Sequence, residues 1–178
     1  MKKNYNIYYL EDKEEHYKTI SQNLKTYLNI TILPTPENRT ADLEKFQAYA
    51  DMPNATHRNV VRLLLLEYKL DLIILDQQIG DENNVGSRVY SDIIIDKPGF
   101  EELNVISYSG AKYNRQPIRT RTAKYYQFPK GDIATSAITL CEDIRKILKM
   151  PNDSILEKLA KKLKQTRQNT NKKWLWKR

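Results

Sequence analysis

Leu70-Asp71-Leu72-Ile73-Ile74-Leu75-Asp76 predicts a strand that is buried on both faces. Between Leu72 and Leu75 the apolar residues follow one another without the alternation expected of a half-exposed strand. Such near-continuous hydrophobicity is typical of a central strand in a parallel sheet that has helices on both sides. The run stops at Asp76, which places a carboxylate at the carboxyl end of this predicted strand.

Shorter apolar runs on both sides of this segment predict the other strands, namely residues 7–10, 30–33, 105–108 and 125–128. Segments with helical periodicity separate them, namely residues 14–28, 41–50, 59–68, 85–95 and a last one that begins near Asp132. In the helix at 59–68, the residues expected to face the core are Val60, Val61, Leu64 and Leu65. The alternation predicts an α/β fold with a mostly parallel sheet. Our working hypothesis is a doubly wound, flavodoxin-like sheet of five parallel strands in the order 2-1-3-4-5.

Length and composition place the chain among ordinary globular proteins. Its 178 residues suffice for one domain with an extension, and 40% of them are hydrophobic and 29% charged. No apolar run approaches the length that crosses a bilayer, and the N-terminal residues lack the features of a signal peptide. A single cysteine, Cys141, excludes an internal disulfide and is expected in the core. We therefore expect a cytoplasmic protein.

The net charge of +8 is concentrated at the C-terminus. Residues 150–178 carry nine basic and two acidic side chains, whereas residues 1–149 are almost neutral. This contrast predicts a domain at 1–149 and a basic extension at 150–178. A second basic segment without acids lies at 112–124. An anionic partner, either nucleic acid or a membrane surface, is expected to bind at 112–124 and 158–178.

The extension combines its charge with apolar residues. Asn152 or Asp153 can cap an amphipathic helix that carries Ile155, Leu156, Leu159 and Leu163, and this helix is a candidate element for binding a protein partner. Further on, Trp174 and Trp176 stand among lysines. They are expected to dock on the domain, on a partner, at a membrane interface or on bases, or to be exposed in a disordered tail.

Polar residues of a particular kind follow four of the five predicted strands. They are Glu11 and Asp12 after strand one, Asp76 after strand three, Ser109 after strand four and Lys130 after strand five. In an open parallel sheet the ligand site lies at the carboxyl ends of the strands, so these residues are expected to converge. Three carboxylates suit Mg²⁺, and one at a strand tip can act as a nucleophile toward phosphorus. A hydroxyl and an ammonium group can bind the phosphoryl oxygens.

This pattern resembles the receiver domain of two-component response regulators, over residues 5–149. The motifs that carry the resemblance are Tyr9-Leu10-Glu11-Asp12, Leu72-Ile73-Ile74-Leu75-Asp76, Val105-Ile106-Ser107-Tyr108-Ser109-Gly110 and Phe128-Pro129-Lys130-Gly131. Each motif alone is common, but their order on successive strands is specific. The resemblance implies a phosphoacceptor domain rather than an enzyme with turnover.

The resemblance also implies roles for individual residues. Glu11 and Asp12 would bind Mg²⁺ through their side chains, and Gln78 through its backbone carbonyl. Asp76 would be a further metal ligand and would accept the phosphoryl group from a histidine kinase or a phosphotransfer protein. The downstream partner would be another protein, contacted in a manner that depends on phosphorylation.

At the other strands, the resemblance implies that Ser109 follows the phosphoryl group and that Lys130 pairs with it. Gly86 matches a glycine common before the third helix. The chain departs from the family at Gln127, where a switch aromatic is usual, and at residues 39–53, which resemble an insertion after strand two. The fourth helix is shortened or replaced in the basic segment. The phosphorylation chemistry is therefore expected to be intact, and the switch and output surface to differ.

Two alternative functions remain open at this point. The first is a degenerate receiver that acts as a scaffold or adaptor through segment 112–124 and the basic extension. The second is a Mg²⁺-dependent phosphohydrolase, which usually has a second aspartate where this chain has Gln78. Taken singly, Glu11 and Asp12 could simply open a helix, and Asp76 could form a turn.

Overall fold

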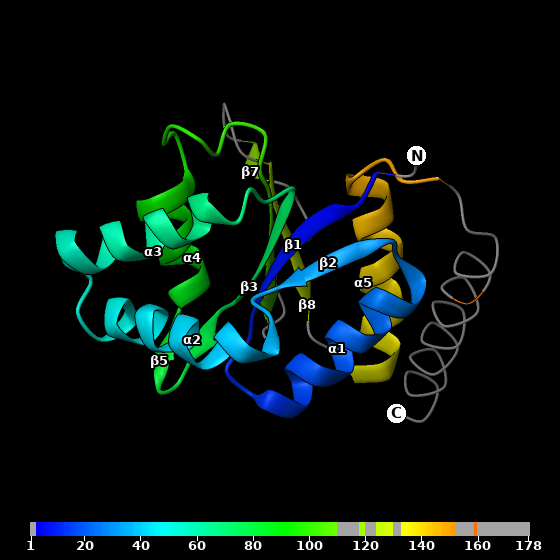
Figure 1. The fold of residues 1–178 in the computed structure, drawn as a ribbon, viewed down its shortest axis with the longest axis horizontal. Coiled ribbons are helices and arrows are strands. Elements are labelled where there is room, and N and C mark those ends of the chain that lie inside the picture. The colour runs from blue at the N-terminus through cyan, green and yellow to red at the C-terminus, as the bar shows by residue number, and fades with distance from the viewer. Residues whose placement is uncertain (1–2, 110–117, 120–123, 130–132, 152–158, 160–178) are drawn as a thin grey trace, which may run out of the picture.

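The computed structural model describes residues 3–109, 118–119, 124–129, 133–151 and 159. Its centre is a six-stranded sheet in the order β2-β1-β3-β6-β8-β7 (Figure 1). The strands are β1 (Tyr5–Leu10), β2 (Ile30–Leu33), β3 (Leu72–Asp76), β6 (Asn104–Ser109), β7 (Ile118–Arg119) and β8 (Lys124–Pro129). Among the predicted features, Lys130, Asp132, most of the basic segment, and the extension apart from Met150, Pro151 and Leu159 lie outside the described residues.

The first five strands of this order are parallel, as each pairing shows. The predicted order 2-1-3-4-5 is therefore confirmed, with β6 and β8 as the fourth and fifth strands. The sixth strand, β7, was not predicted and runs antiparallel to β8, where Ile118 pairs with Tyr125. A strand of two residues is too short for its periodicity to be recognised in a sequence.

Helices cover both faces of the sheet (Figure 1). They are α1 (Glu14–Tyr27), α2 (Pro36–Asp51), α3 (Ala55–Glu67), α4 (Val85–Val89), the π-helix η1 (Tyr90–Ile94) and α5 (Ile133–Ile147). All five residues of β3 are buried, as predicted. Leu72 and Ile74 pack against α1 and α5, whereas Ile73 and Leu75 pack against the helices of the other face. Among the described residues, no helix has the length and apolarity needed to traverse a membrane.

Cys141 lies in α5 on the face that packs against the sheet, and it is fully buried. Burial raises the pKa of its thiol to about 12. The prediction that Cys141 is a core residue is confirmed.

The connection between β2 and β3 contains two helices. The sequence predicted a short helix from residue 41, but α2 begins at Pro36 and continues to Asp51. Proline is favourable in the first turn of a helix because its missing N–H would have no partner there. Most of residues 39–53, expected as an insertion, therefore forms one regular helix on the sheet.

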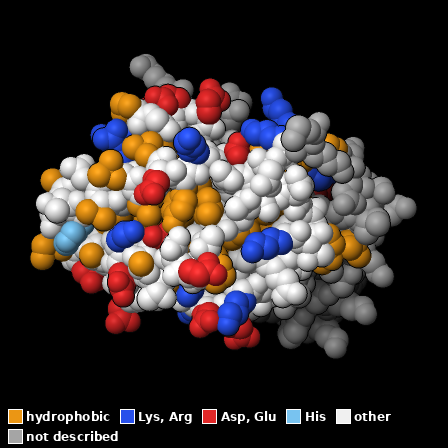
Figure 2. All heavy atoms as spheres, viewed as in Figure 1, with side chains coloured by type: hydrophobic (Ala, Val, Ile, Leu, Met, Phe, Trp, Pro, Cys, Tyr) orange, Lys and Arg blue, Asp and Glu red, His pale blue; other side chains and the backbone are white. Residues whose placement is uncertain are grey.

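The outer side of α2 and α3 carries apolar side chains that remain exposed, and Figure 2 shows hydrophobic atoms gathered on this side of the molecule. The large exposed apolar side chains here are those of Met52, directly after α2, and of Val60 and Leu63 in α3. The expectation that Val60 faces the core was wrong: its neighbour Val61 is buried, while 40% of Val60 is exposed. Successive helical residues are rotated by about 100°, so they do not share one face for the whole length of a helix.

Asn54 caps the N-terminus of α3, because its side-chain Oδ1 accepts a hydrogen bond from the backbone N–H of His57 at 2.9 Å. Replacing Asn54 with alanine is expected to lower the free energy of unfolding by about 1 kcal/mol. Urea denaturation followed by circular dichroism would measure this change. Asn54→Asp keeps the acceptor oxygen and is expected to be nearly neutral, and an equal loss in both variants would contradict the capping role.

Candidate functional site

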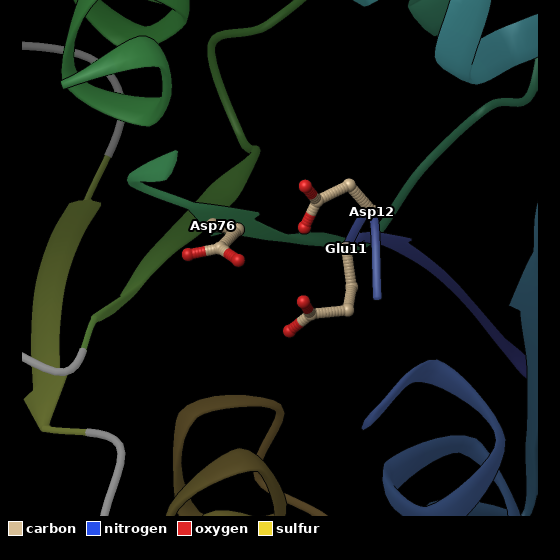
Figure 3. Close-up of side chains that lie close together, drawn as sticks. All are labelled: Glu11, Asp12 and Asp76. Carbon is tan, nitrogen blue, oxygen red and sulfur yellow. The ribbon is translucent and has the colours of Figure 1, made fainter. Parts of the chain in front are cut away.

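Three carboxylates meet at the carboxyl ends of β1 and β3. Glu11 and Asp12 directly follow β1, Asp76 ends β3, and these two strands are neighbours in the sheet. Figure 3 shows the three side chains directed toward one another, and they offer carboxylate oxygens that lie within 4.8 Å of one another. Glu11 is 1% exposed and Asp76 is 4% exposed. The expected convergence of these three residues is therefore observed.

The chemistry of this cluster fits a divalent cation. Carboxylates so close together repel one another, and removing two of them from water adds a desolvation cost. A cation offsets both effects, and a set of carboxylate oxygens is the donor set that Mg²⁺ and Mn²⁺ prefer. Acidic clusters on open surfaces are common without a metal, but Glu11 and Asp76 are buried.

Glu11 is oriented by its own strand and by the start of α1. The Tyr9 hydroxyl donates a hydrogen bond to Oε2 at 3.1 Å, and the backbone N–H of Lys13 donates to Oε1 at 3.3 Å. Burial, followed by the nearby Glu11 charge, raises the pKa of Tyr9 well above its usual value, so this hydroxyl remains a donor. Nδ1 of His16 lies 3.8 Å from Oε1. His16 belongs to the surroundings of the site, which its sequence context did not indicate.

A small antiparallel hairpin, β4 (Gln78–Ile79) and β5 (Glu82–Asn83), follows Asp76. Its backbone binds the carboxylates of Asp12 and Asp76. The backbone N–H of Gly80 in its turn donates to Oδ2 of Asp12 at 2.9 Å. The backbone N–H of Gln78 donates to Oδ1 of Asp76 at 3.3 Å. Gln78, whose carbonyl the sequence proposed as a metal ligand, thus lies next to the acceptor candidate, and the role of that carbonyl stays a prediction.

The residue after the acceptor candidate, Gln77, is buried and joins three segments. Its Nε2 donates to Oγ of Ser107 at 2.5 Å, and its Oε1 accepts from the backbone N–H and the hydroxyl of Ser87. This network fixes the end of β3 to β6 and to the start of α4. Sequence reasoning passed over Gln77 because a glutamine beside an aspartate has no signature of its own.

Gly86 lies against the backbone of the acceptor candidate. A Cβ atom at this position would be 2.6 Å from the carbonyl oxygen of Asp76 and 2.7 Å from Nε2 of Gln77. Real Cβ atoms essentially never show contacts below 3.0 Å. The glycine that the resemblance singled out is therefore required here by the close approach of α4 to β3.

Arg39 in α2 contacts the backbone of the acidic pair. Its Nη2 donates hydrogen bonds to the carbonyl oxygens of Glu11 and Asp12, both at 2.9 Å. The guanidinium lies over the ring of Tyr17, 4.8 Å from its centroid. The sequence gave no signal for Arg39, because it is 27 residues beyond Asp12 and lies in the segment that was expected to be an insertion.

The two remaining site predictions concern Ser109 and Lys130. Asp76 pairs with Tyr108 in the β3–β6 register, so the backbone of Ser109 lies one residue beyond the acceptor candidate. Ser109 in turn pairs with Pro129, the residue before Lys130. The side chain of Ser109 and the whole of Lys130 lie outside the described part of the chain, and their roles stay predictions.

No family model and no curated protein matches the chain. Solved structures similar to it include a DNA-binding response regulator of the LuxR family from Staphylococcus aureus, 16% identical over 81% of this chain and 98% of the other, with a TM-score of 0.44. The phosphorylated cyanobacterial phytochrome response regulator RcpA is 14% identical over 85% and 98%, with a TM-score of 0.45. The Mn²⁺-bound response regulator Rcp1 is 14% identical over 83% and 97%, with a TM-score of 0.44. At this low sequence identity, the similarity to response-regulator receivers is a similarity of fold alone.

Proposed function

We propose that this protein is a receiver that accepts a phosphoryl group on Asp76 and transmits the change through protein contacts. The observation that carries the proposal is the meeting of Glu11, Asp12 and Asp76 at the carboxyl ends of adjacent parallel strands. Asp76 is the member of this group that ends the central strand, held there by the Gln78 N–H. The donor would be a histidine kinase or a phosphotransfer protein.

In the proposed reaction, a carboxylate oxygen of Asp76 attacks the phosphorus of a phosphohistidine. The new O–P bond forms as the P–N bond breaks, and the imidazole of the donor leaves with the electron pair and takes up a proton. The product is an acyl phosphate on Asp76.

Glu11, Asp12 and Asp76 would hold the Mg²⁺ ion, together with the backbone carbonyl of Gln78. When bound, Mg²⁺ supplies positive charge that offsets the negative charge of the phosphoryl oxygens. Ser109 and Lys130 are proposed to bind those oxygens as hydrogen-bond donor and counter-charge.

The basic extension at 150–178 and segment 112–124 are proposed to provide output contacts outside this reaction. Their positive charge favours binding to an anionic partner. The apolar stripe of the extension favours binding in a groove of a partner protein. The scaffold hypothesis shares this part of the proposal and differs from it in leaving Asp76 unused.

The function is tested by incubating the purified protein with Mg²⁺ and acetyl phosphate and measuring its intact mass. The expected result is a single phosphoryl adduct that disappears when EDTA is included and returns when excess Mg²⁺ is added. The reason is that the clustered carboxylates need a cation before a phosphoryl dianion can approach. No adduct on a chain shown to be folded by circular dichroism, with acetyl phosphate and then with a phosphorylated histidine kinase, would count against the proposal.

A further inference from the structure

We infer that helix α2 is a built-in support for the cation site and that Arg39 is its positioning residue. The part of this inference that concerns phosphoryl transfer rests on the proposed function. The part that concerns cation affinity rests on the acidic cluster and on the contacts that α2 makes around it.

The first observation is the way that Arg39 binds the loop between β1 and α1. One nitrogen, Nη2, donates to two successive carbonyl oxygens, those of Glu11 and Asp12. Hydrogen bonds from a charged donor are stronger than those between neutral groups. Fixing two successive carbonyls fixes the peptide plane between them, and this plane sets the directions in which the two acidic side chains leave the backbone.

The start of α1 adds no side-chain cap to this loop. Lys13 occupies the N-cap position of α1, and its side chain makes no capping hydrogen bond. One hydrogen bond within the loop runs from the Lys13 N–H to the Glu11 carboxylate, the group that has to be positioned. Arg39 therefore supplies an anchor from outside the loop.

Arg39 is itself held in one orientation. Its guanidinium lies over the ring of Tyr17, and the Tyr17 hydroxyl donates to the carbonyl oxygen of Pro34 at 2.6 Å. Tyr17 also stacks on Tyr9, with 5.7 Å between the ring centroids. Since Tyr9 donates to the Glu11 carboxylate, Glu11 is fixed at its backbone through Arg39 and at its side chain through Tyr9. Such a locked surrounding shell is what gives a metal site its geometry.

A second contact of α2 reaches Asp12 through the β4–β5 hairpin. Gln47, two turns after Arg39, lies against the turn of the β4–β5 hairpin, where a Cβ atom on Gly80 would be 2.8 Å from its Oε1. The N–H of Gly80 binds the Asp12 carboxylate. The amide of Gln47 is held in turn by the hydrogen bond from its Nε2 to Asp51, at 2.6 Å. Helix α2 thus supports both the backbone and the carboxylate of Asp12.

Loss of the Arg39 side chain is expected to affect the cation site more than the stability of the fold. Arg39 is half-buried, so water can replace it at the two carbonyl oxygens, and the fold would lose little. The acidic side chains would then sample more than one orientation. Loss of a group that orients a metal ligand typically weakens metal binding by about 10- to 100-fold.

The experiment is a calorimetric titration with Mn²⁺ and with Mg²⁺, without any phosphoryl donor. Arg39→Met removes the donors at similar length, and Arg39→Lys retains a charge and a donor. Arg62→Met is the matched control, because Arg62 also donates from a helix to a carbonyl oxygen, that of Pro98. The dissociation constant is expected to rise at least about tenfold in Arg39→Met, to recover partly in Arg39→Lys and to stay unchanged in Arg62→Met. The rate of phosphorylation of Arg39→Met is expected to recover at saturating cation.

Equal dissociation constants for the parent and Arg39→Met would overturn the inference and leave the proposed function standing. An equal weakening in Arg62→Met would also overturn it, because the effect would then be general. Absence of cation binding in the folded parent would overturn both. If Arg39→Met does not fold, Arg39→Gln takes its place under the same criterion.

Discussion

Asp76→Asn is expected to form no phosphoryl adduct at all under conditions in which the parent is fully labelled. The amide is nearly isosteric with the carboxylate, and its oxygen can still accept the hydrogen bond from Gln78. It lacks the negative charge that makes the carboxylate oxygen a nucleophile and a metal ligand. The loss should therefore be complete while circular dichroism shows an unchanged fold, with intact mass as the measurement.

Asp81→Asn is the control for this loss. Asp81 lies five residues after Asp76, in the turn between β4 and β5. It is exposed and is not a member of the carboxylate cluster. Its variant is expected to be labelled like the parent. An adduct that persists in Asp76→Asn, or that disappears in Asp81→Asn, would indicate that the phosphoryl acceptor is a residue other than Asp76.

Gly86→Ala is expected to lower the free energy of unfolding by about 2–3 kcal/mol, a large effect for one methyl group. The added carbon would come within 2.6 Å of the Asp76 carbonyl oxygen, and Cβ of Leu75 is also only 3.1 Å away. Neither neighbour can move easily, because both belong to the central strand. Either α4 moves outward or the end of β3 is displaced, so labelling of Asp76 should fall as well. Urea unfolding and intact mass would measure the two effects.

Ser91→Ala is the matched control for stability, because Ser91 is an exposed residue on the π-helix that continues α4. A change at such a surface position is expected to stay within about 0.5 kcal/mol. If Gly86→Ala also stayed within that limit, α4 would not be packed against β3 as tightly as the contacts of Gly86 indicate.

The elements with strong local patterns were predictable from the sequence. The apolar run that ends in Asp76 could form only a buried strand, and strand β3 is buried along its whole length. The acidic cluster was predictable for a related reason. Parallel strands end on the same edge of a sheet, so Glu11, Asp12 and Asp76 had to meet once β1 and β3 were neighbours.

The contacts that hold the acidic residues in place were not predictable, because they depend on where the helices lie on the sheet. Arg39 reaches Glu11 across 28 residues, and nothing in its local sequence indicates that contact. The hairpin of β4 and β5 and the edge strand β7 were missed because two-residue strands carry no periodicity. The start of α2 was predicted five residues too late, at residue 41, although a proline such as Pro36 is favourable in the first turn of a helix.

The two edges of the sheet bear on how the protein behaves at high concentration. A long exposed edge strand offers unpaired N–H and carbonyl groups to another molecule and so promotes aggregation. Here one edge strand, β2, has four residues and is followed by Pro34, and the other, β7, has two residues and includes Arg119. Short edges that carry a proline or a charge disfavour intermolecular strand pairing, so the described sheet is poorly suited to growing by the addition of strands from other copies.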